Sequence, residues 1–122
     1  MEELTKKVVE FANERGWLQY NTPENLAKSI SIEAAELLEC FQWTNDYKKD
    51  EVKYELADVM NYCIMMCYQI GVDPKEVILE KMTITGKKYP IERSNKATDS
   101  TAKINDYKSM KNEFRKSQNK ED

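Results

Sequence analysis

Apolar residues recur at helical spacing through most of this 122-residue chain, and only three glycines and three prolines interrupt the pattern. Side chains three and four residues apart share one face of a helix, whereas a strand alternates with a period of two. The pattern predicts an all-α protein, and the length fits one domain with one core. Four helices are expected, over residues 3–15, 23–42, 50–70 and 74–87.

Local signals mark the ends of these helices. Thr22 and Asp73 each precede a proline, which is the pattern of an N-cap residue followed by proline at the first helical position. Gly16 and Gly71 follow two of the helices, where glycine commonly ends a helix. Residues 1–90 are therefore expected to form the folded domain. Residues 91–122 are expected to form a polar linker and tail, with a weak helical pattern over residues 103–117.

The third expected helix is apolar nearly all round from Leu56 onward, which predicts a central position in the core. Asp58 and Asn61 interrupt this apolar surface. A buried carboxylate needs a partner or a metal ion, because desolvating an unpaired charge is costly. Asp58 is therefore expected to be buried and compensated.

Two acidic pairs share a spacing of one helical turn. Glu33 and Glu36 lie on the second expected helix, and Glu55 and Asp58 lie on the third. Residues i and i+3 are neighbours on a helix surface. Two such patches face to face supply four oxygen ligands, which suit a hard cation such as Mg²⁺. The alternative interpretation is ordinary solvated helix charge, with Lys53 as the local counter-charge.

Composition excludes several classes of function. The chain has no histidine, which removes Ser-His and Cys-His nucleophilic catalysis. Its three cysteines have neither disulfide nor zinc spacing, and its net charge of −3 predicts no general affinity for DNA or RNA. No apolar run reaches the roughly 20 residues of a membrane span. The N-terminus lacks a signal-peptide pattern, so a cytoplasmic protein is expected.

Aromatic and basic residues indicate how a nucleotide would be held. Trp17, Tyr20 and Trp43 bracket the second expected helix and are candidates to sandwich a base. Packing against apolar neighbours is an equal alternative for each tryptophan. The basic side chains that are candidates for a polyphosphate come later, at Lys81, Lys87 and Lys88.

Three runs of sequence, FANERGWLQYNTPENLAKSISIEAAELLECFQW, YELADVMNYC and KMTITGKKYP, together resemble the MazG-like all-α nucleoside triphosphate pyrophosphatases. The resemblance covers about residues 5–90 and is strongest to the dCTP pyrophosphatase branch. It implies a four-helix bundle that assembles as a dimer or tetramer. It also implies Mg²⁺-dependent hydrolysis, with Mn²⁺ as a substitute, between the α and β phosphates of a dCTP-like nucleotide.

The resemblance also implies roles for individual residues. The metal-binding and catalytic positions of the family match Glu33, Glu36, Glu55 and Asp58. The positions that contact the base or lie near the substrate match Trp17, Trp43 and Tyr62, and those of the phosphate-side motif match Lys81, Lys88 and Tyr89. Two further substrate positions depart from the pattern. Thr85 stands where the family usually has Asn, and Asn21 stands where the dCTP branch often has His, and both departures concern base specificity more than reaction type.

Three functions compete on the sequence alone. The leading hypothesis is an enzyme that removes non-standard or excess nucleoside triphosphates. The second is a metal- and nucleotide-binding regulatory module with little turnover, which Thr85 would favour. The third is a structural α-bundle whose carboxylates are surface charge. Metal binding distinguishes the last from the first two, because a ligand that binds only the folded state raises its melting temperature.

Overall fold

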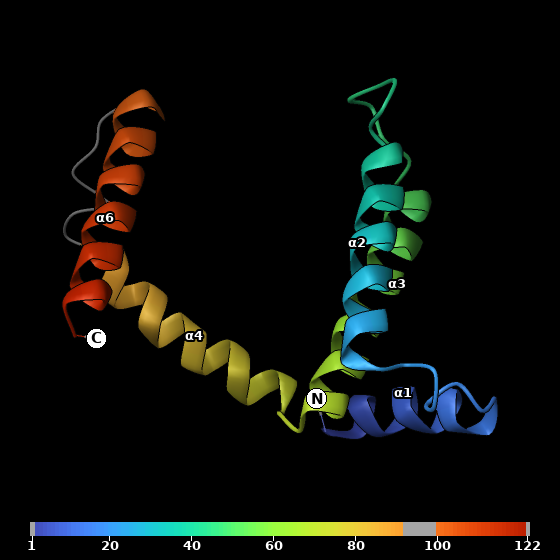
Figure 1. Cartoon of the computed structure of the whole chain (residues 1–122). Helices are drawn as coiled ribbons and strands as arrows, with labels where there is room; N and C mark the ends of the chain where they lie inside the picture. The colour runs from blue at the N-terminus through green and yellow to red at the C-terminus, as the bar shows by residue number, and fades with distance from the viewer. Residues whose placement is uncertain (1, 92–99, 122) are drawn as a thin grey trace. The chain divides into compact units, whose positions relative to one another are not determined.

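The computed structural model describes residues 2–91 and 100–121, and within these ranges it contains helices and no strand (Figure 1). This confirms the all-α prediction. The helices are α1 (Glu2–Glu14), α2 (Pro23–Glu39), α3 (Lys49–Ile70), α4 (Pro74–Lys88) and α6 (Ser100–Glu121). None of them is both long and apolar enough to cross a membrane. The chain divides into two compact units, residues 1–76 and 77–122.

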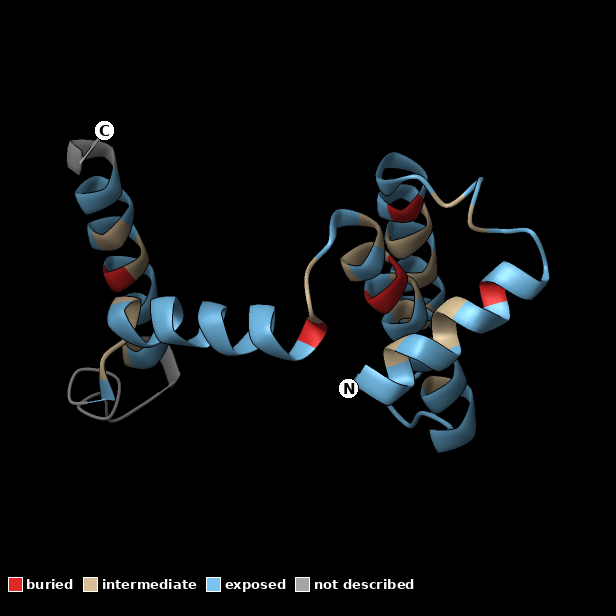
Figure 2. Cartoon of the chain, turned by 90° about the horizontal axis from the view of Figure 1, so that it is seen from below, coloured by how far each residue is buried: buried red, intermediate tan, exposed pale blue. Residues whose placement is uncertain are grey.

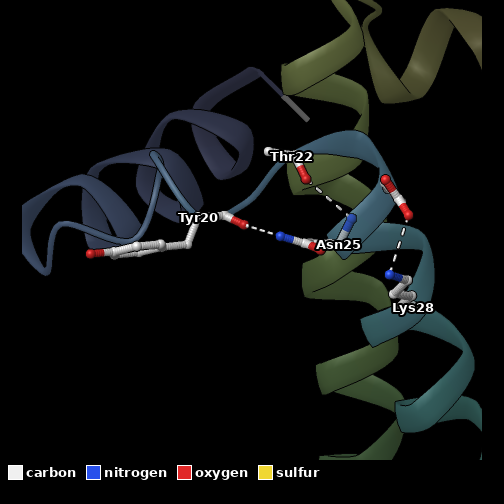
Figure 3. Close-up of polar contacts among 5 residues, drawn as sticks. Tyr20, Thr22, Asn25 and Lys28 are labelled. Carbon is white, nitrogen blue, oxygen red and sulfur yellow. Dashed lines mark hydrogen bonds and ion pairs between the residues drawn. The ribbon is translucent and has the colours of Figure 1, made fainter.

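The predicted signals at the helix ends are confirmed. The Oγ1 of Thr22 accepts a hydrogen bond of 3.2 Å from the backbone N–H of Asn25, and Pro23 opens α2 (Figure 3). Asp73 accepts one of 2.9 Å from the N–H of Glu76 in the same way. Each bond satisfies a backbone donor that a helix start leaves unpaired. At the other end of α3, Gly71 has φ +77°, a left-handed conformation that other residues rarely adopt.

The core of the first unit lies where three helices meet. α2 and α3 lie side by side, and α1 packs against α3 (Figure 1). Ala12 of α1, Leu26 of α2 and Met65 of α3 are buried together at this junction (Figure 2). Leu18 and Tyr62 pack around them. The small side chain of Ala12 lets α1 approach α3 closely at this junction.

Two expectations about burial are wrong within the single chain. α3 was expected to be central in the core, yet Leu56 and Met60 are both exposed. Asp58 was expected to be buried, but it is exposed too, whereas Glu33 and Glu55 are half-buried. The physical reason is that one neighbouring helix on each side covers only part of an all-round apolar helix. α2 also ends at Glu39, three residues before the expected Gln42, and residues 40–42 form a turn instead.

In the second unit, the end of α4 packs against α6. The ring of Tyr89, just beyond α4, stacks on the ring of Tyr107 with centroids 4.5 Å apart and an interplanar angle of 6°. Lys88 lies over the rings of Tyr89 and Phe114, and Met110 is buried. α6 is longer than the weak helical pattern over residues 103–117. Most of the linker expected before it falls on residues 92–99, outside the described residues.

Candidate active site

Packing of α2 against α3 brings three of the predicted acidic residues together. Glu33, Glu55 and Asp58 each offer a carboxylate oxygen, and these oxygens all lie within 4.8 Å of one another. Glu36, one turn along α2 from Glu33, has its carboxyl within hydrogen-bonding reach of Glu33 and Glu55. The two i, i+3 pairs therefore do face each other across the helix pair, and we call these four side chains the acidic cluster.

The acidic cluster has no basic side chain to neutralise it in the described part of the chain. The ion pairs found there join other acids, and Lys53 pairs with Asp50 at 3.6 Å instead of with Glu55. The close carboxyl of Glu36 and partial burial raise the pKa of Glu33 to about 7. Burial, followed by repulsion from Glu36 and Asp58, also raises the pKa of Glu55. Crowded carboxylates resist ionisation in this way when no cation compensates them.

The donor set fits a hard divalent cation. One oxygen of Glu33 and one of Glu55, the Oε2 atoms, are buried without a hydrogen-bond partner among the described residues. Such atoms need a partner, and carboxylate oxygens are the ligands that Mg²⁺ prefers. Two bonds of about 2.1 Å to one ion would separate their oxygens by about 4 Å or less. The spacing within the acidic cluster is close to that range.

A small pocket opens beside the acidic cluster, between α1, the segment after it and α3. Its volume is about 160 Å³, and it is lined by aromatic, aliphatic and amide side chains. Among them are Phe11, Trp17, Asn21, Asn61, Tyr62 and Met65. Three of these, Trp17, Asn21 and Tyr62, are substrate positions predicted from the sequence, and the structure brings them together.

Hydrogen bonds hold the segment between α1 and α2 in place. The N–H of Trp17 donates to the carbonyl of Ala12 at 3.0 Å, and the N–H of Asn21 donates to the carbonyls of Trp17 and Leu18. Asn25 donates from its side chain to the carbonyl of Tyr20 at 3.0 Å, which fixes this segment to the start of α2 (Figure 3). Gln69 of α3 donates to the carbonyl of Leu18 at 3.2 Å. The pocket wall formed by Trp17 and Asn21 is therefore tied to both neighbouring helices.

α3 connects the pocket with the acidic cluster. Tyr62 follows Asp58 by four residues, so the two side chains lie on the same face of the helix, about 6 Å apart along its axis. Asn61 follows Asp58 by three residues and also lies one turn away. A ligand whose flat ring lies in the pocket would thus hold the chemical group attached to that ring close to the carboxylates.

The remaining predicted site residues are not among those that line this pocket. Trp43 is in the connection between α2 and α3 and is 88% exposed. It does not line the pocket beside the acidic cluster. Lys81, Thr85 and Tyr89 line an apolar groove on α4 in the second unit, and Lys88 contacts Tyr89 there. These assignments stay predictions.

The pocket also includes residues that were not among the predicted site residues, notably Phe11 and Asn61. Phe11 reads as one more apolar position of an amphipathic helix, and its ring lies 5.9 Å from that of Trp17. Asn61 interrupts the apolar surface of α3. This interruption is a usable signal in the sequence, because Asn favours caps and turns over helix interiors.

Comparisons with known proteins agree with this geometry. Residues 28–104 match the model of the MazG-like family. The chain is 32% identical over 100 residues to dCTP pyrophosphatase 1 of Homo sapiens and 30% identical over 104 residues to that of Mus musculus. These alignments cover 74% and 77% of this chain but 59% and 61% of the relatives, so the chain spans about three fifths of their length.

A solved structure is also similar. The crystal structure of a pyrophosphatase from Archaeoglobus fulgidus matches with a TM-score of 0.68 and 46% sequence identity. The match covers 74% of this chain and 92% of that one. The likeness therefore extends over nearly the whole of the smaller protein and leaves about a quarter of this chain unmatched.

Proposed function

Because the chain belongs to the MazG-like family, we propose that it is a nucleoside triphosphate pyrophosphohydrolase. It cleaves between the α and β phosphates of a dCTP-like nucleotide in the cytoplasm and releases a nucleoside monophosphate and pyrophosphate. The observation that carries this proposal is an uncompensated acidic cluster one helical turn from a pocket of ring size. The relatives named dCTP pyrophosphatase 1 support the substrate class.

The acidic cluster is the proposed Mg²⁺ site, with Mn²⁺ as a substitute. Glu33, Glu55 and Asp58 hold the cation, and Glu36 contributes from the next turn of α2. A bound divalent cation attracts phosphate oxygens and stabilises the charge that develops on them. The carboxylates also keep the local charge negative until the cation arrives, which prevents a triphosphate from binding alone.

The pocket is the proposed base site. Trp17 and Tyr62 offer aromatic faces to a flat ring, and Asn21 offers an amide at the rim. Lys81, Lys88 and Tyr89 are proposed for the phosphate side, as is Thr85. Trp43 is proposed to contact the base as well.

The test is a product analysis with a panel of nucleoside triphosphates and Mg²⁺. We expect dCTP to give dCMP and pyrophosphate in equal amounts, read by anion-exchange chromatography or ³¹P NMR, and EDTA to abolish the reaction. Release of dCDP and inorganic phosphate would contradict the assigned bond. The regulatory alternative, which the Thr85 departure favours, predicts instead that dCTP with Mg²⁺ raises the melting temperature while no product forms.

A second prediction concerns assembly. Several large apolar side chains on α2 and α3 are exposed in the single chain, among them Ile32, Leu38, Leu56 and Met60. Large exposed apolar patches are rare on stable monomers, so we expect a homodimer or a tetramer. Light scattering coupled to size-exclusion chromatography will measure the mass. A stable monomer at micromolar concentration would contradict the proposed assembly.

A further inference from the structure

The size of the pocket limits what it can hold. Its volume of about 160 Å³ is close to that of engineered cavities of about 150 Å³, which take one benzene ring. A pyrimidine is a single six-membered ring, whereas a purine adds a fused second ring. The pocket therefore matches a single-ring base.

The pocket lining is apolar except for amide groups and a phenol. Asn21 stands on the segment after α1 and Asn61 on α3, so their side chains reach the pocket from two different elements. The backbone N–H of Asn21 is already used within its own segment. Among the described residues, neither side-chain amide makes a hydrogen bond. Both remain available to a ligand.

Asn61 is exposed in the middle of α3 and also lines the pocket. It is a polar residue between the apolar side chains of Met60 and Tyr62. Its neighbour one turn on, Met65, is 2% exposed and forms part of the core. A leucine at residue 61 would extend the same apolar surface toward α1. The amide of Asn61 adds both a hydrogen-bond donor and an acceptor to a pocket wall that consists mostly of aromatic and aliphatic side chains.

We propose that Asn61 determines which base the pocket accepts, by hydrogen bonding to the polar edge of a pyrimidine that lies between the aromatic residues and the amides. This inference deepens the proposed function and rests on it for the triphosphate. The base itself is recognised in the absence of phosphate or metal. Asn61 lies one turn from Asp58, so a base held there leads its phosphates to the acidic cluster.

The chemistry of the amide gives a sharp distinction between two substitutions. Asn61→Leu keeps the approximate shape and removes both hydrogen-bonding functions. Asn61→Asp keeps an acceptor but loses the donor NH₂ group. Cytosine presents an amino donor where uracil presents a carbonyl acceptor. The aspartate variant can therefore still pair with the amino group of cytosine but leaves the carbonyl of uracil without a donor.

Binding of free nucleosides measures this directly. Trp17 is one of two tryptophans in the chain and lines the pocket, so quenching of the wild-type tryptophan fluorescence reports occupation of the pocket. The probes are 2′-deoxycytidine, 2′-deoxyuridine and 2′-deoxyadenosine, with EDTA present. We expect saturable quenching by both pyrimidines and weaker binding of the purine. Asn61→Leu should weaken pyrimidine binding about tenfold, within the range of a bidentate amide contact, and Asn61→Asp should raise the preference for deoxycytidine over deoxyuridine about tenfold.

Asn13→Leu and Asn13→Asp are the matched controls, because Asn13 is exposed on α1 and does not line the pocket. Melting temperatures will show that each variant folds. Unchanged nucleoside affinities in Asn61→Leu, an unchanged cytosine-to-uracil ratio in Asn61→Asp, or equal binding of the purine would each overturn the inference. Pyrimidine binding without hydrolysis of any triphosphate would leave the inference standing and contradict only the proposed function.

Failure of the nucleosides to quench the fluorescence would contradict recognition of the base without phosphate, and turnover then tests the role of Asn61 by itself. The ratio of kcat/KM for dCTP to that for dUTP is then compared between the wild type and Asn61→Asp. A ratio that stays the same while hydrolysis continues refutes the role of Asn61 and leaves the enzyme intact. A ratio that rises about tenfold supports it.

Discussion

Asp58→Asn is expected to lower the rate of pyrophosphate release from dCTP by more than the roughly 10- to 100-fold that loss of an outer-shell partner of a metal costs. The substitution keeps the shape of the side chain and removes one negative oxygen from the acidic cluster. Affinity for Mg²⁺ should fall together with the rate. The measurements are steady-state release of pyrophosphate and a titration with Mg²⁺ followed by melting temperature.

The stability of the metal-free protein separates the members of the acidic cluster. Asp58 is exposed, so Asp58→Asn should leave the melting temperature in EDTA nearly unchanged. Glu33→Gln removes a charge from the most crowded carboxyl, so it should raise the melting temperature in EDTA at pH 8 while also abolishing turnover. Both variants should lose metal binding, and only Glu33→Gln should gain stability in EDTA.

Glu39→Gln is the control for these variants, because it makes the same chemical change on α2 one turn beyond Glu36. Glu39 is exposed and outside the group of oxygens that approach one another, so turnover and Mg²⁺ affinity should stay within a few-fold of the wild type. Full activity in Asp58→Asn would mean that the acidic cluster does not hold the catalytic metal. The same conclusion would follow if Mg²⁺ left the melting temperature of the wild type unchanged.

The second large effect is a loss of stability of the metal-free protein as the pH rises, which Mg²⁺ is expected to offset. The pKa of Glu33 is about 7 in the folded protein against an ordinary value of 4.5, so the folded state binds more protons than the unfolded state between these values. The resulting stabilisation is fully present below pH 4.5 and is lost as the pH rises through about 7. The raised pKa of Glu55 acts in the same direction.

Divalent cations compete with these protons for the same oxygens. We therefore expect the melting temperature in EDTA to fall between pH 5 and pH 8, and the increase caused by Mg²⁺ to be small at pH 5 and large at pH 8. Differential scanning calorimetry across this range checks both. Glu33→Gln should flatten the profile in EDTA. A larger effect of Mg²⁺ at pH 5 than at pH 8 would show that protons and metal do not share the acidic cluster.

Features that depend on nearby residues were predictable from the sequence. The caps at Thr22 and Asp73 and the left-handed Gly71 need only a few neighbouring residues, and they are found as expected. The i, i+3 spacing of the acidic pairs is also local. When α2 and α3 pack side by side, this spacing brings the two acidic pairs together.

Burial and long-range contacts were less predictable. The periodicity of α3 shows that its surface is apolar, but not whether this chain or a second copy covers it, so Asp58 was wrongly expected to be buried. The pocket joins Phe11 and Trp17 to Asn61, which is distant in sequence, and no local pattern records that contact. Trp43 also flanks α2 but is not among the residues that line this pocket, so its contact with the base stays a prediction.

The two halves of the proposed site differ in how they would respond to local unfolding. The acidic cluster is made by α2 and α3, which are consecutive in the chain, whereas the pocket also requires α1 to stay docked through Ala12. Proteins open in cooperative segments, and segments with few buried contacts open most readily. A molecule whose α1 has transiently detached retains its carboxylates but has lost one wall of the proposed base site. Detachment of α1 would then lower the selectivity for the base while leaving in place the carboxylates that are proposed to hold the metal.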